Sequence, residues 1–185
     1  MKKVEDYVRS IPDFPEPGII FRDITTVLQD PEGLKLAIDG LKERLDGVDF
    51  DVVVGAESRG FIFGAPLAYE FGKGFVPVRK KGKLPCETVC AKYDLEYGSA
   101  EIEMHKDSIK PGQKVVLVDD LVATGGTIEA AIKLVEELGG EVKDITDDLP
   151  FEIPDSWSLV RLSSVCWLTD APKITGEKLP YLDAK

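Results

Sequence analysis

The sequence is poor in histidine and cysteine. His105 is its only histidine, and its three cysteines, Cys86, Cys90 and Cys166, contain no Cys-x-x-Cys pair. A single histidine makes a Ser-His-Asp triad hard to build and excludes a histidine-rich metal site. The odd number of isolated cysteines indicates reduced, incidental thiols rather than a disulfide framework.

Positive charge and long apolar runs are also scarce. The chain has 23 Lys and Arg against 34 Asp and Glu, so its formal net charge is −11. Such a surface repels phosphate backbones, which argues against a nucleic-acid partner and requires any anion site to be local. No segment resembles a signal peptide or reaches membrane-spanning length. We therefore expect a soluble cytoplasmic protein with no membrane partner.

The most informative stretch is an apolar strand that runs into two acids and a loop of small residues. The four residues Val115–Val118 have no polar alternation, which is typical of a parallel strand covered on both faces in an α/β sheet. Asp119 and Asp120 follow at its carboxyl end. Residues 123–127 carry no bulky side chain, and the apolar residues after them repeat at helical spacing up to a pair of glycines.

This order of strand, acids, loop and helix predicts a sugar-phosphate site. The first backbone N–H groups of a helix are unpaired and carry the positive end of its dipole, so they can bind a phosphate. Carboxylates accept hydrogen bonds from vicinal ribose hydroxyls, and the hydroxyls of Thr124 and Thr127 add donors. The stretch is not a P-loop, because no Lys-Ser/Thr pair follows the glycines. The simpler alternative is a buried strand followed by a solvated acidic turn and a flexible loop.

Two further strands end in polar loops. Residues 51–55 form a second apolar run, which leads into a loop and helix containing Arg59. Residues 75–78 form a third, which leads into Arg79, Lys80, Lys81 and Lys83. Concentrated positive charge beside a phosphate site suits a pyrophosphate, although a solvated basic turn is the competing interpretation.

The amino-terminal region predicts short elements around a rigid segment. Apolar residues between Val4 and Ile11 indicate a short amphipathic helix ended by Pro12. The proline-rich residues 11–24 place Phe21 where it can stack on a flat heterocycle, although a core position is the more common fate of such a residue. Asp30 and Pro31 then have the pattern of an N-cap and first-turn proline.

Residues 90–104 alternate between apolar and polar in places, around a turn-like segment at residues 94–98. This pattern predicts a hairpin that stands away from the sheet as a mobile hood. Lys110-Pro111-Gly112 predicts the turn that leads into the central strand.

Five segments occur in order along residues 11–142: IPDFPEPGIIFRD, ESRGFIFG, VRKKGKLP, YDLEYG and VDDLVATGGT. In identity and order they resemble the adenine phosphoribosyltransferases, a family of the type I phosphoribosyltransferase fold. The resemblance implies an α/β fold with an open, mostly parallel sheet flanked by helices and a small hood. It also implies that adenine and phosphoribosyl pyrophosphate give AMP and pyrophosphate, with Mg²⁺, in purine salvage. Members of the family form homodimers.

The resemblance also assigns roles by position. It makes Glu96 the acid–base group at adenine, for which a solvated hairpin acid is the alternative, and it implies a cis peptide at Glu57-Ser58. The Mg²⁺ ion would have no direct protein ligand and would be held mainly through substrate oxygens and water. The remaining roles are ribose binding by Asp119 and Asp120; 5′-phosphate binding by Ala123, Thr124, Gly125, Gly126 and Thr127; pyrophosphate binding by Glu57, Ser58, Arg59, Arg79, Lys80 and Lys83; and adenine binding by Ile20, Phe21 and Arg22.

The carboxyl-terminal tail departs from this pattern. After Val142 the family continues with apolar strands, whereas no buried strand is visible here. Residues 149–162 and 179–185 instead resemble the opening of a recognition domain from type I restriction specificity subunits. We expect a phosphoribosyltransferase domain at residues 1–148, and at 149–185 a grafted tail that is no independent domain and binds no DNA; an unusual native terminus is the alternative.

Two other functions remain open. A phosphoribosyltransferase of the same fold can prefer another purine. A regulator of the same fold can sense phosphoribosyl pyrophosphate without turning it over, although such a regulator is expected to carry a DNA-binding domain or a basic face.

Overall fold

The computed structural model describes residues 2–95, 98–121 and 125–142, so the predictions for the tail lie outside the described residues. The described residues fall into two compact units, 2–40 and 41–142. Within them, no helix combines the length and the apolar character that crossing a membrane requires.

The first unit consists of short elements around a two-stranded sheet. A 3₁₀ helix, η1 (Val4–Tyr7), precedes β1 (Arg9–Pro12), which pairs antiparallel with β2 (Ile20–Asp23). Helix α1 (Thr25–Gln29) and most of α2 (Pro31–Leu45) follow.

The predicted helix across Val4 to Ile11 is wrong beyond Tyr7. Ile11 is opposite Phe21 in the strand pair, and the side chain of Arg9 donates to the carboxylate of the buried Asp23, with 3.0 Å between Nε and Oδ2. These cross-strand contacts outweigh the helical spacing of a few apolar residues, because a helix this short is marginal without packing.

The predicted start of α2 is confirmed. The side chain of Asp30 accepts hydrogen bonds from the N–H groups of Glu32 and Gly33, at 2.9 and 3.0 Å, and Pro31 occupies the first helical position. The aspartate thereby satisfies donors that have no partner inside the helix.

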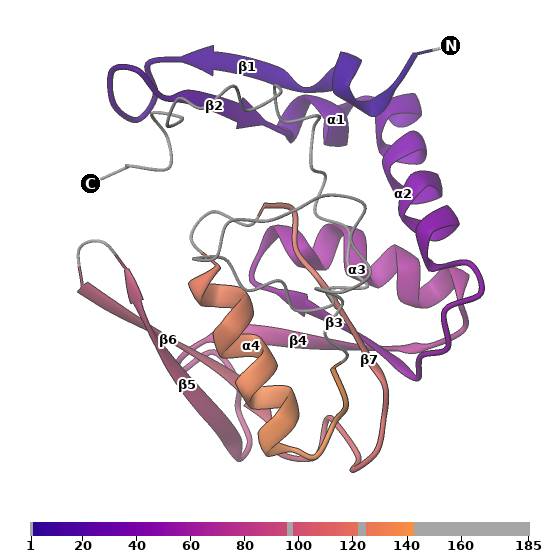
Figure 1. The fold of residues 1–185 in the computed structure, drawn as a ribbon, viewed down its shortest axis with the longest axis vertical. Helices are drawn as coiled ribbons and strands as arrows, with labels where there is room; N and C mark the ends of the chain where they lie inside the picture. The colour runs from indigo at the N-terminus through magenta and orange to yellow at the C-terminus, as the bar shows by residue number, and fades with distance from the viewer. Residues whose placement is uncertain (1, 96–97, 122–124, 143–185) are drawn as a thin grey trace, which may run out of the picture. The chain divides into compact units, whose positions relative to one another are not determined.

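The second unit is a five-stranded sheet with helices on both faces, as the sequence predicted (Figure 1). The strand order is β5-β6-β4-β3-β7; β3 pairs in parallel with β4 and β7, whereas the hairpin β5–β6 is antiparallel. Its elements in chain order are β3 (Val52–Ala56), α3 (Arg59–Glu70), β4 (Gly74–Lys80), β5 (Thr88–Leu95), β6 (Gly98–His105), β7 (Val115–Val118) and α4 (Gly126–Glu137).

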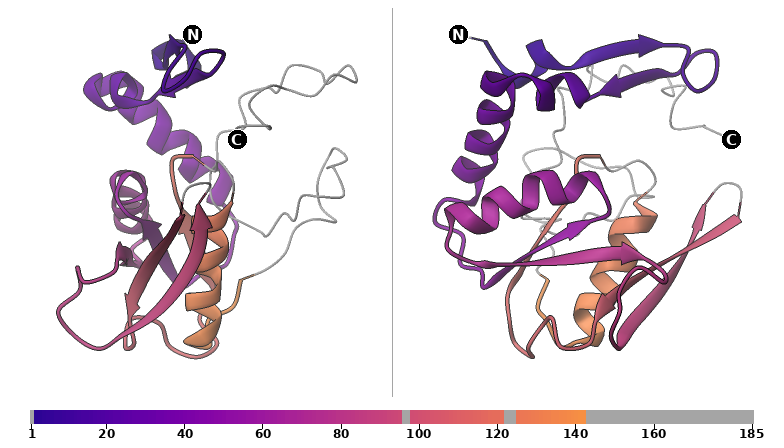
Figure 2. Two further views of the ribbon diagram at one scale, coloured as in Figure 1. Left: turned by 90° about the vertical axis from the view of Figure 1, so that its left-hand side faces the viewer. Right: turned by 180° about the vertical axis from the view of Figure 1, so that it is seen from behind.

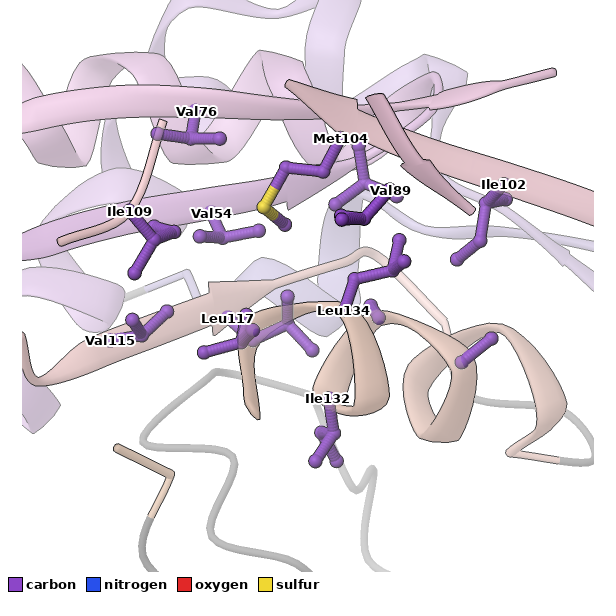
Figure 3. Close-up of a cluster of buried hydrophobic side chains, with 14 of the residues drawn as sticks. Val54, Val76, Val89, Ile102, Met104, Ile109, Val115, Leu117, Ile132 and Leu134 are labelled. Carbon is purple, nitrogen blue, oxygen red and sulfur yellow. The ribbon is translucent and has the colours of Figure 1, made fainter. Parts of the chain in front are cut away.

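Helices α3 and α4 cover opposite faces of this sheet (Figure 2). On one face, Val54 and Leu117 belong to a buried cluster with Leu134 of α4 (Figure 3). On the other face, Val53 lies against Gly64 of α3. Since successive strand side chains point to opposite faces, a strand buried on both faces must be apolar throughout, and both β3 and β7 are.

The predicted hairpin forms, but the expectation that it stands away from the sheet is wrong for its base. Strand β6 pairs with the end of β4, where Glu103 is opposite Arg79. Val89 of β5 and Met104 of β6 are buried in the same cluster as α4 (Figure 3). The base of the hairpin is therefore part of the core, and its tip at residues 96–97 lies outside the described residues.

We predict that Leu134→Ala lowers the free energy of unfolding by about 2–5 kcal/mol, because Leu134 has no exposed surface and the substitution leaves a cavity. Chemical denaturation measures the change. The control is Lys133→Ala, at the adjacent exposed position of α4, with an expected effect within about 0.5 kcal/mol. Equal effects of the two substitutions would contradict the described packing of α4.

Candidate active site

Three strands of the second unit end at the same edge of the sheet. Ala56 of β3 is opposite Val78 of β4, and Gly55 is opposite Val118 of β7. Because the three strands are parallel, the residues that follow them are brought to one side. This edge of an open α/β sheet is the usual place for a ligand.

A cleft of about 260 Å³ lies at this edge. It brings together most of the polar residues that the sequence placed after the three strands. Of the predicted site residues, those in its lining are Glu57, Ser58, Arg59, Lys80, Asp119, Asp120, Gly125, Gly126 and Thr127.

The cleft depends on a close approach between α3 and β7 at Gly60. A Cβ atom at this position would lie 2.5 Å from the carbonyl oxygen of Val118 and 3.3 Å from the Cα atom of Asp119. Glycine alone avoids this overlap. The start of α3 therefore lies directly against the end of β7.

This approach produces an ion pair between two predicted site residues. Nε of Arg59 lies 2.9 Å from Oδ2 of Asp120, whose side chain is only 5% exposed. The side chain of Arg59 is 43% exposed. One side of the cleft therefore carries a buried carboxylate with its charge balanced, and Arg59 remains open to the solvent.

The carboxyl group of the neighbouring Asp119 has a raised pKa. Burial raises the pKa of Asp119 to about 7, and the negative charge of Asp120 adds to the shift. The N–H group of Asp120 donates to Oδ1 of Asp119 at 2.9 Å, which opposes the shift without cancelling it. Near neutral pH the acid pair therefore includes a carboxyl group that can donate as well as accept a hydrogen bond.

Glu57 connects the ends of β3 and β4. Its Oε2 atom accepts from Nε of Arg79 at 3.1 Å and from the N–H group of Lys80 at 2.8 Å. The Arg79 hydrogen bond, helped by that of Lys80, lowers the pKa of Glu57 although burial opposes it. The peptide between Glu57 and Ser58 is cis, as the resemblance implied.

The start of α4 has the geometry of an anion-binding turn. Gly125 has φ +84°, in the left-handed region that favours glycine, and α4 begins at Gly126. The N–H groups of the first helical turn have no partner inside the helix, and Thr127 places a hydroxyl in the lining of the cleft. Ala123 and Thr124 lie outside the described residues.

Other predicted site residues are not brought into the described lining of the cleft. Arg79 and Lys83 belong to the second unit but are not among the lining residues. Ile20, Phe21 and Arg22 form part of β2 in the first unit, where Ile20 is 54% exposed. Glu96 lies outside the described residues.

The cleft also has lining residues that sequence reasoning missed. Tyr93 is the most polar of them, and the alternation of β5 was the only sequence signal that could have indicated its face. The others are apolar residues of the strands and of the segments that follow β7: Val78, Ile102, Leu121 and Ile128.

The donor set suits a magnesium ion held through a substrate. Among the described residues, no group of three or more His, Cys, Asp or Glu side chains is placed to hold a metal. Magnesium prefers oxygen ligands, keeps several water molecules and commonly binds substrate phosphates with one or two carboxylates. Asp120 is paired with Arg59, so the lining of the cleft leaves the coordination of such an ion mainly to substrate oxygens and water.

Comparison with known proteins gives one consistent result. Residues 23–146 match the family described as "Phosphoribosyl transferase domain". The chain is 76% identical over 145 residues to the adenine phosphoribosyltransferase of Butyrivibrio fibrisolvens, covering 78% of this chain and 81% of that protein. It is also similar to the crystal structure of adenine phosphoribosyltransferase from Thermoanaerobacter pseudethanolicus, at 56% identity and a TM-score of 0.72, over 77% of this chain and 83% of the other.

The structure of a third relative was solved with two bound ligands. The Saccharomyces cerevisiae adenine phosphoribosyltransferase, complexed with an imino-altritol bisphosphate and adenine, is 44% identical to this chain. Its TM-score is 0.70, and the match covers 75% of this chain and 81% of the other.

We predict that Asp119→Asn changes how stability depends on pH. A carboxyl whose pKa is raised in the folded state stabilises that state fully at low pH, and the contribution is lost as pH rises from about 4 to about 7. Between pH 5 and pH 8 the unaltered chain should lose this contribution to its free energy of unfolding, whereas the asparagine variant has none to lose. The free energy of unfolding of the variant, relative to that of the unaltered chain, should therefore rise by on the order of 2 kcal/mol from pH 5 to pH 8. Urea denaturation at the two pH values measures this difference, and an equal pH dependence of both proteins would contradict the raised pKa that partial burial gives Asp119.

Proposed function

The chain belongs to the adenine phosphoribosyltransferase family, and we propose from that membership that it transfers the phosphoribosyl group of phosphoribosyl pyrophosphate to adenine. The products are AMP and pyrophosphate, and the reaction serves purine salvage. The observation that carries the proposal is the cleft at the carboxyl edge of the sheet. It combines an acid pair, the glycine turn of a helix start and two cations, which is what a pyrophosphorylated pentose requires.

The acid pair and the glycine turn are proposed to hold the two ends of the pentose. Asp119 and Asp120 bind the ribose hydroxyls, for which the raised pKa of Asp119 is suited, because a hydroxyl both donates and accepts. The turn at Gly125 and Gly126, with Thr127, binds the 5′-phosphate through N–H groups and a hydroxyl. Ala123 and Thr124 are proposed to complete this turn.

The cations are proposed to stabilise the leaving pyrophosphate. Displacement at the anomeric carbon develops negative charge on the departing group, and fixed positive charges lower the energy of that transition state. Lys80 lines the cleft, and Arg59 is open to solvent there. Arg79 and Lys83 belong with Lys80 to the basic segment at residues 79–83. Glu57 and Ser58 are proposed to belong to the pyrophosphate site, where Glu57 also holds this segment through its contacts with Arg79 and Lys80. Magnesium, when bound through pyrophosphate oxygens and water, supplies further neutralising charge.

Adenine is proposed to bind to β2. The backbone near Ile20 and Arg22 offers hydrogen-bonding groups, and the ring of Phe21 offers a stacking surface. Phe14 contacts this ring edge to face, with centroids 5.3 Å apart, and is itself 50% exposed. Glu96 is proposed to exchange a proton with a ring nitrogen of adenine.

The surroundings of the enzyme are proposed from the same membership. We infer a homodimer in the cytoplasm. We also propose that residues 1–148 form the transferase domain and that residues 149–185 form a tail, resembling a restriction specificity subunit, that is no independent domain.

The function is tested by incubating the purified chain with phosphoribosyl pyrophosphate, Mg²⁺ and each purine in turn. We expect pyrophosphate release with adenine and at most trace release with hypoxanthine or guanine. Faster pyrophosphate release with another purine would identify that purine, and not adenine, as the preferred substrate. Binding of phosphoribosyl pyrophosphate without release for any purine would favour the sensing regulator.

We predict that Glu96→Gln lowers kcat by about 10²–10⁴-fold and leaves the KM for phosphoribosyl pyrophosphate nearly unchanged, because general acid–base catalysis contributes this much. The matched control is Glu87→Gln, since Glu87 is a glutamate whose side chain is 84% exposed and pairs only at the surface with Lys106. Steady-state kinetics separates the two constants. Unchanged kcat in the Glu96 variant would remove Glu96 from the reaction.

We predict that the purified full chain is not retained on duplex DNA at physiological salt, because its net charge of −11 repels phosphate backbones. A gel-shift titration measures retention. Specific retention in the micromolar range would contradict the proposal that the tail is no recognition domain.

A further inference from the structure

Glu103 is a buried carboxylate for which the proposed roles provide no explanation. Its residue is only 4% exposed and lies on β6, opposite Arg79 of β4. Burying a charged group costs free energy unless hydrogen bonds compensate it. The partners of Glu103 therefore indicate what the residue does.

These partners are backbone groups of the turn after β4, at residues 81–84, which we call the basic turn. Oε1 of Glu103 accepts hydrogen bonds from the N–H groups of Lys83 and Leu84, each at 2.8 Å. The hydroxyl of Thr88 lies 3.5 Å from Oε2. Burial by itself would raise the pKa of Glu103, but the N–H groups of Leu84, Gly82 and Lys83 outweigh it and hold the pKa below its ordinary value. Glu103 is therefore charged at neutral pH.

A second glutamate of β6 binds the start of the same turn. Glu101 forms an ion pair with the ammonium group of Lys81, and its carbonyl oxygen accepts from the N–H group of Lys81 at 3.1 Å. Residues 101 and 103 are two apart on one strand, so their side chains point to the same face. Strand β6 thus fixes the turn at Lys81 and again at Lys83 and Leu84.

The arrangement leaves two ammonium groups of the basic segment available. Within the described part of the chain, the side chains of Lys80 and Lys83 form no ion pair, whereas Arg79 pairs with Glu57 and Lys81 with Glu101. Lys80 lines the cleft. Glu103 therefore binds Lys83 through the backbone and leaves its side chain free for an anion.

We propose that Glu103 is a positioning residue for the pyrophosphate end of the substrate. By binding the N–H groups of Lys83 and Leu84, it fixes the turn of residues 81–84 before the substrate arrives. An anion then meets a turn whose backbone is already ordered and which carries the Lys83 side chain, unpaired among the described residues, so that binding does not have to order a loop and costs less free energy. This inference rests on the proposed function, because it gives the basic segment the same ligand.

Three variants of the full chain test the proposal. Glu103→Ala removes the acceptor, Glu103→Gln retains an oxygen at the position of Oε1, and Val89→Ala destabilises the buried cluster without altering the turn. Titration calorimetry with pyrophosphate and Mg²⁺ measures affinity, thermal unfolding measures stability, and amide hydrogen exchange reports on the N–H groups of Lys83 and Leu84.

We expect Glu103→Ala to weaken pyrophosphate binding about tenfold or more and to accelerate exchange at both amides, because each loses its acceptor. Glu103→Gln should stay within about threefold of the unaltered chain in affinity. Val89→Ala should lower the unfolding temperature while leaving pyrophosphate affinity unchanged.

The outcomes separate this inference from the proposed function. If the unaltered chain binds neither pyrophosphate nor phosphoribosyl pyrophosphate, the proposed function fails and the inference fails with it. If the unaltered chain binds pyrophosphate and Glu103→Ala binds it equally well, or keeps both amides protected, only the positioning role is overturned. Equal weakening by Val89→Ala would likewise reduce Glu103 to a general contributor to stability.

Discussion

The parallel pairing of β3 with both β4 and β7 is the constraint on which the rest of the second unit depends. It aligns Ala56 with Val78 and Gly55 with Val118, so that three chain segments leave the sheet at one edge. The acid pair, the basic segment and Glu57 are far apart in sequence and meet only because of this register. The register in turn requires strands that are apolar on both faces, since α3 and α4 cover them from opposite sides (Figure 2).

Charge at this edge is arranged in pairs. Arg59 lies against Asp120, and Arg79 against Glu57, so two cations that suit a pyrophosphate are held by carboxylates of the same site. In a chain with a net charge of −11, these pairs fix the positions of the two guanidinium groups, although they also neutralise part of the charge of each. Asp120 also depends on its ion pair with Arg59, because a carboxylate with 5% exposure requires a partner. A phosphate ligand would therefore enter a site whose cations are already oriented.

Local sequence patterns predicted the parts of this site that are local. The apolar run of β7, the acids after it and the start of α4 are adjacent in sequence, and the structure has them in the predicted order, with α4 beginning at Gly126 inside the small-residue loop. Contacts between distant segments were not predictable in this way. Gly60 against Val118, Arg59 with Asp120 and Glu103 with the basic turn depend on strand order and register, which residue periodicity does not contain. The hairpin was misplaced for the same reason, because its attachment to β4 rests on a few pairs distant in sequence.

The central claim is that the acid pair and the glycine turn hold opposite ends of one pentose. A crystal structure of the full chain with phosphoribosyl pyrophosphate and Mg²⁺ tests it most directly. We expect the ribose hydroxyls within hydrogen-bonding distance of Asp119 and Asp120, and the 5′-phosphate on the N–H groups of Gly126 and Thr127. A sugar phosphate bound elsewhere, with the turn at Gly125 left empty, would contradict these roles of the acid pair and the turn.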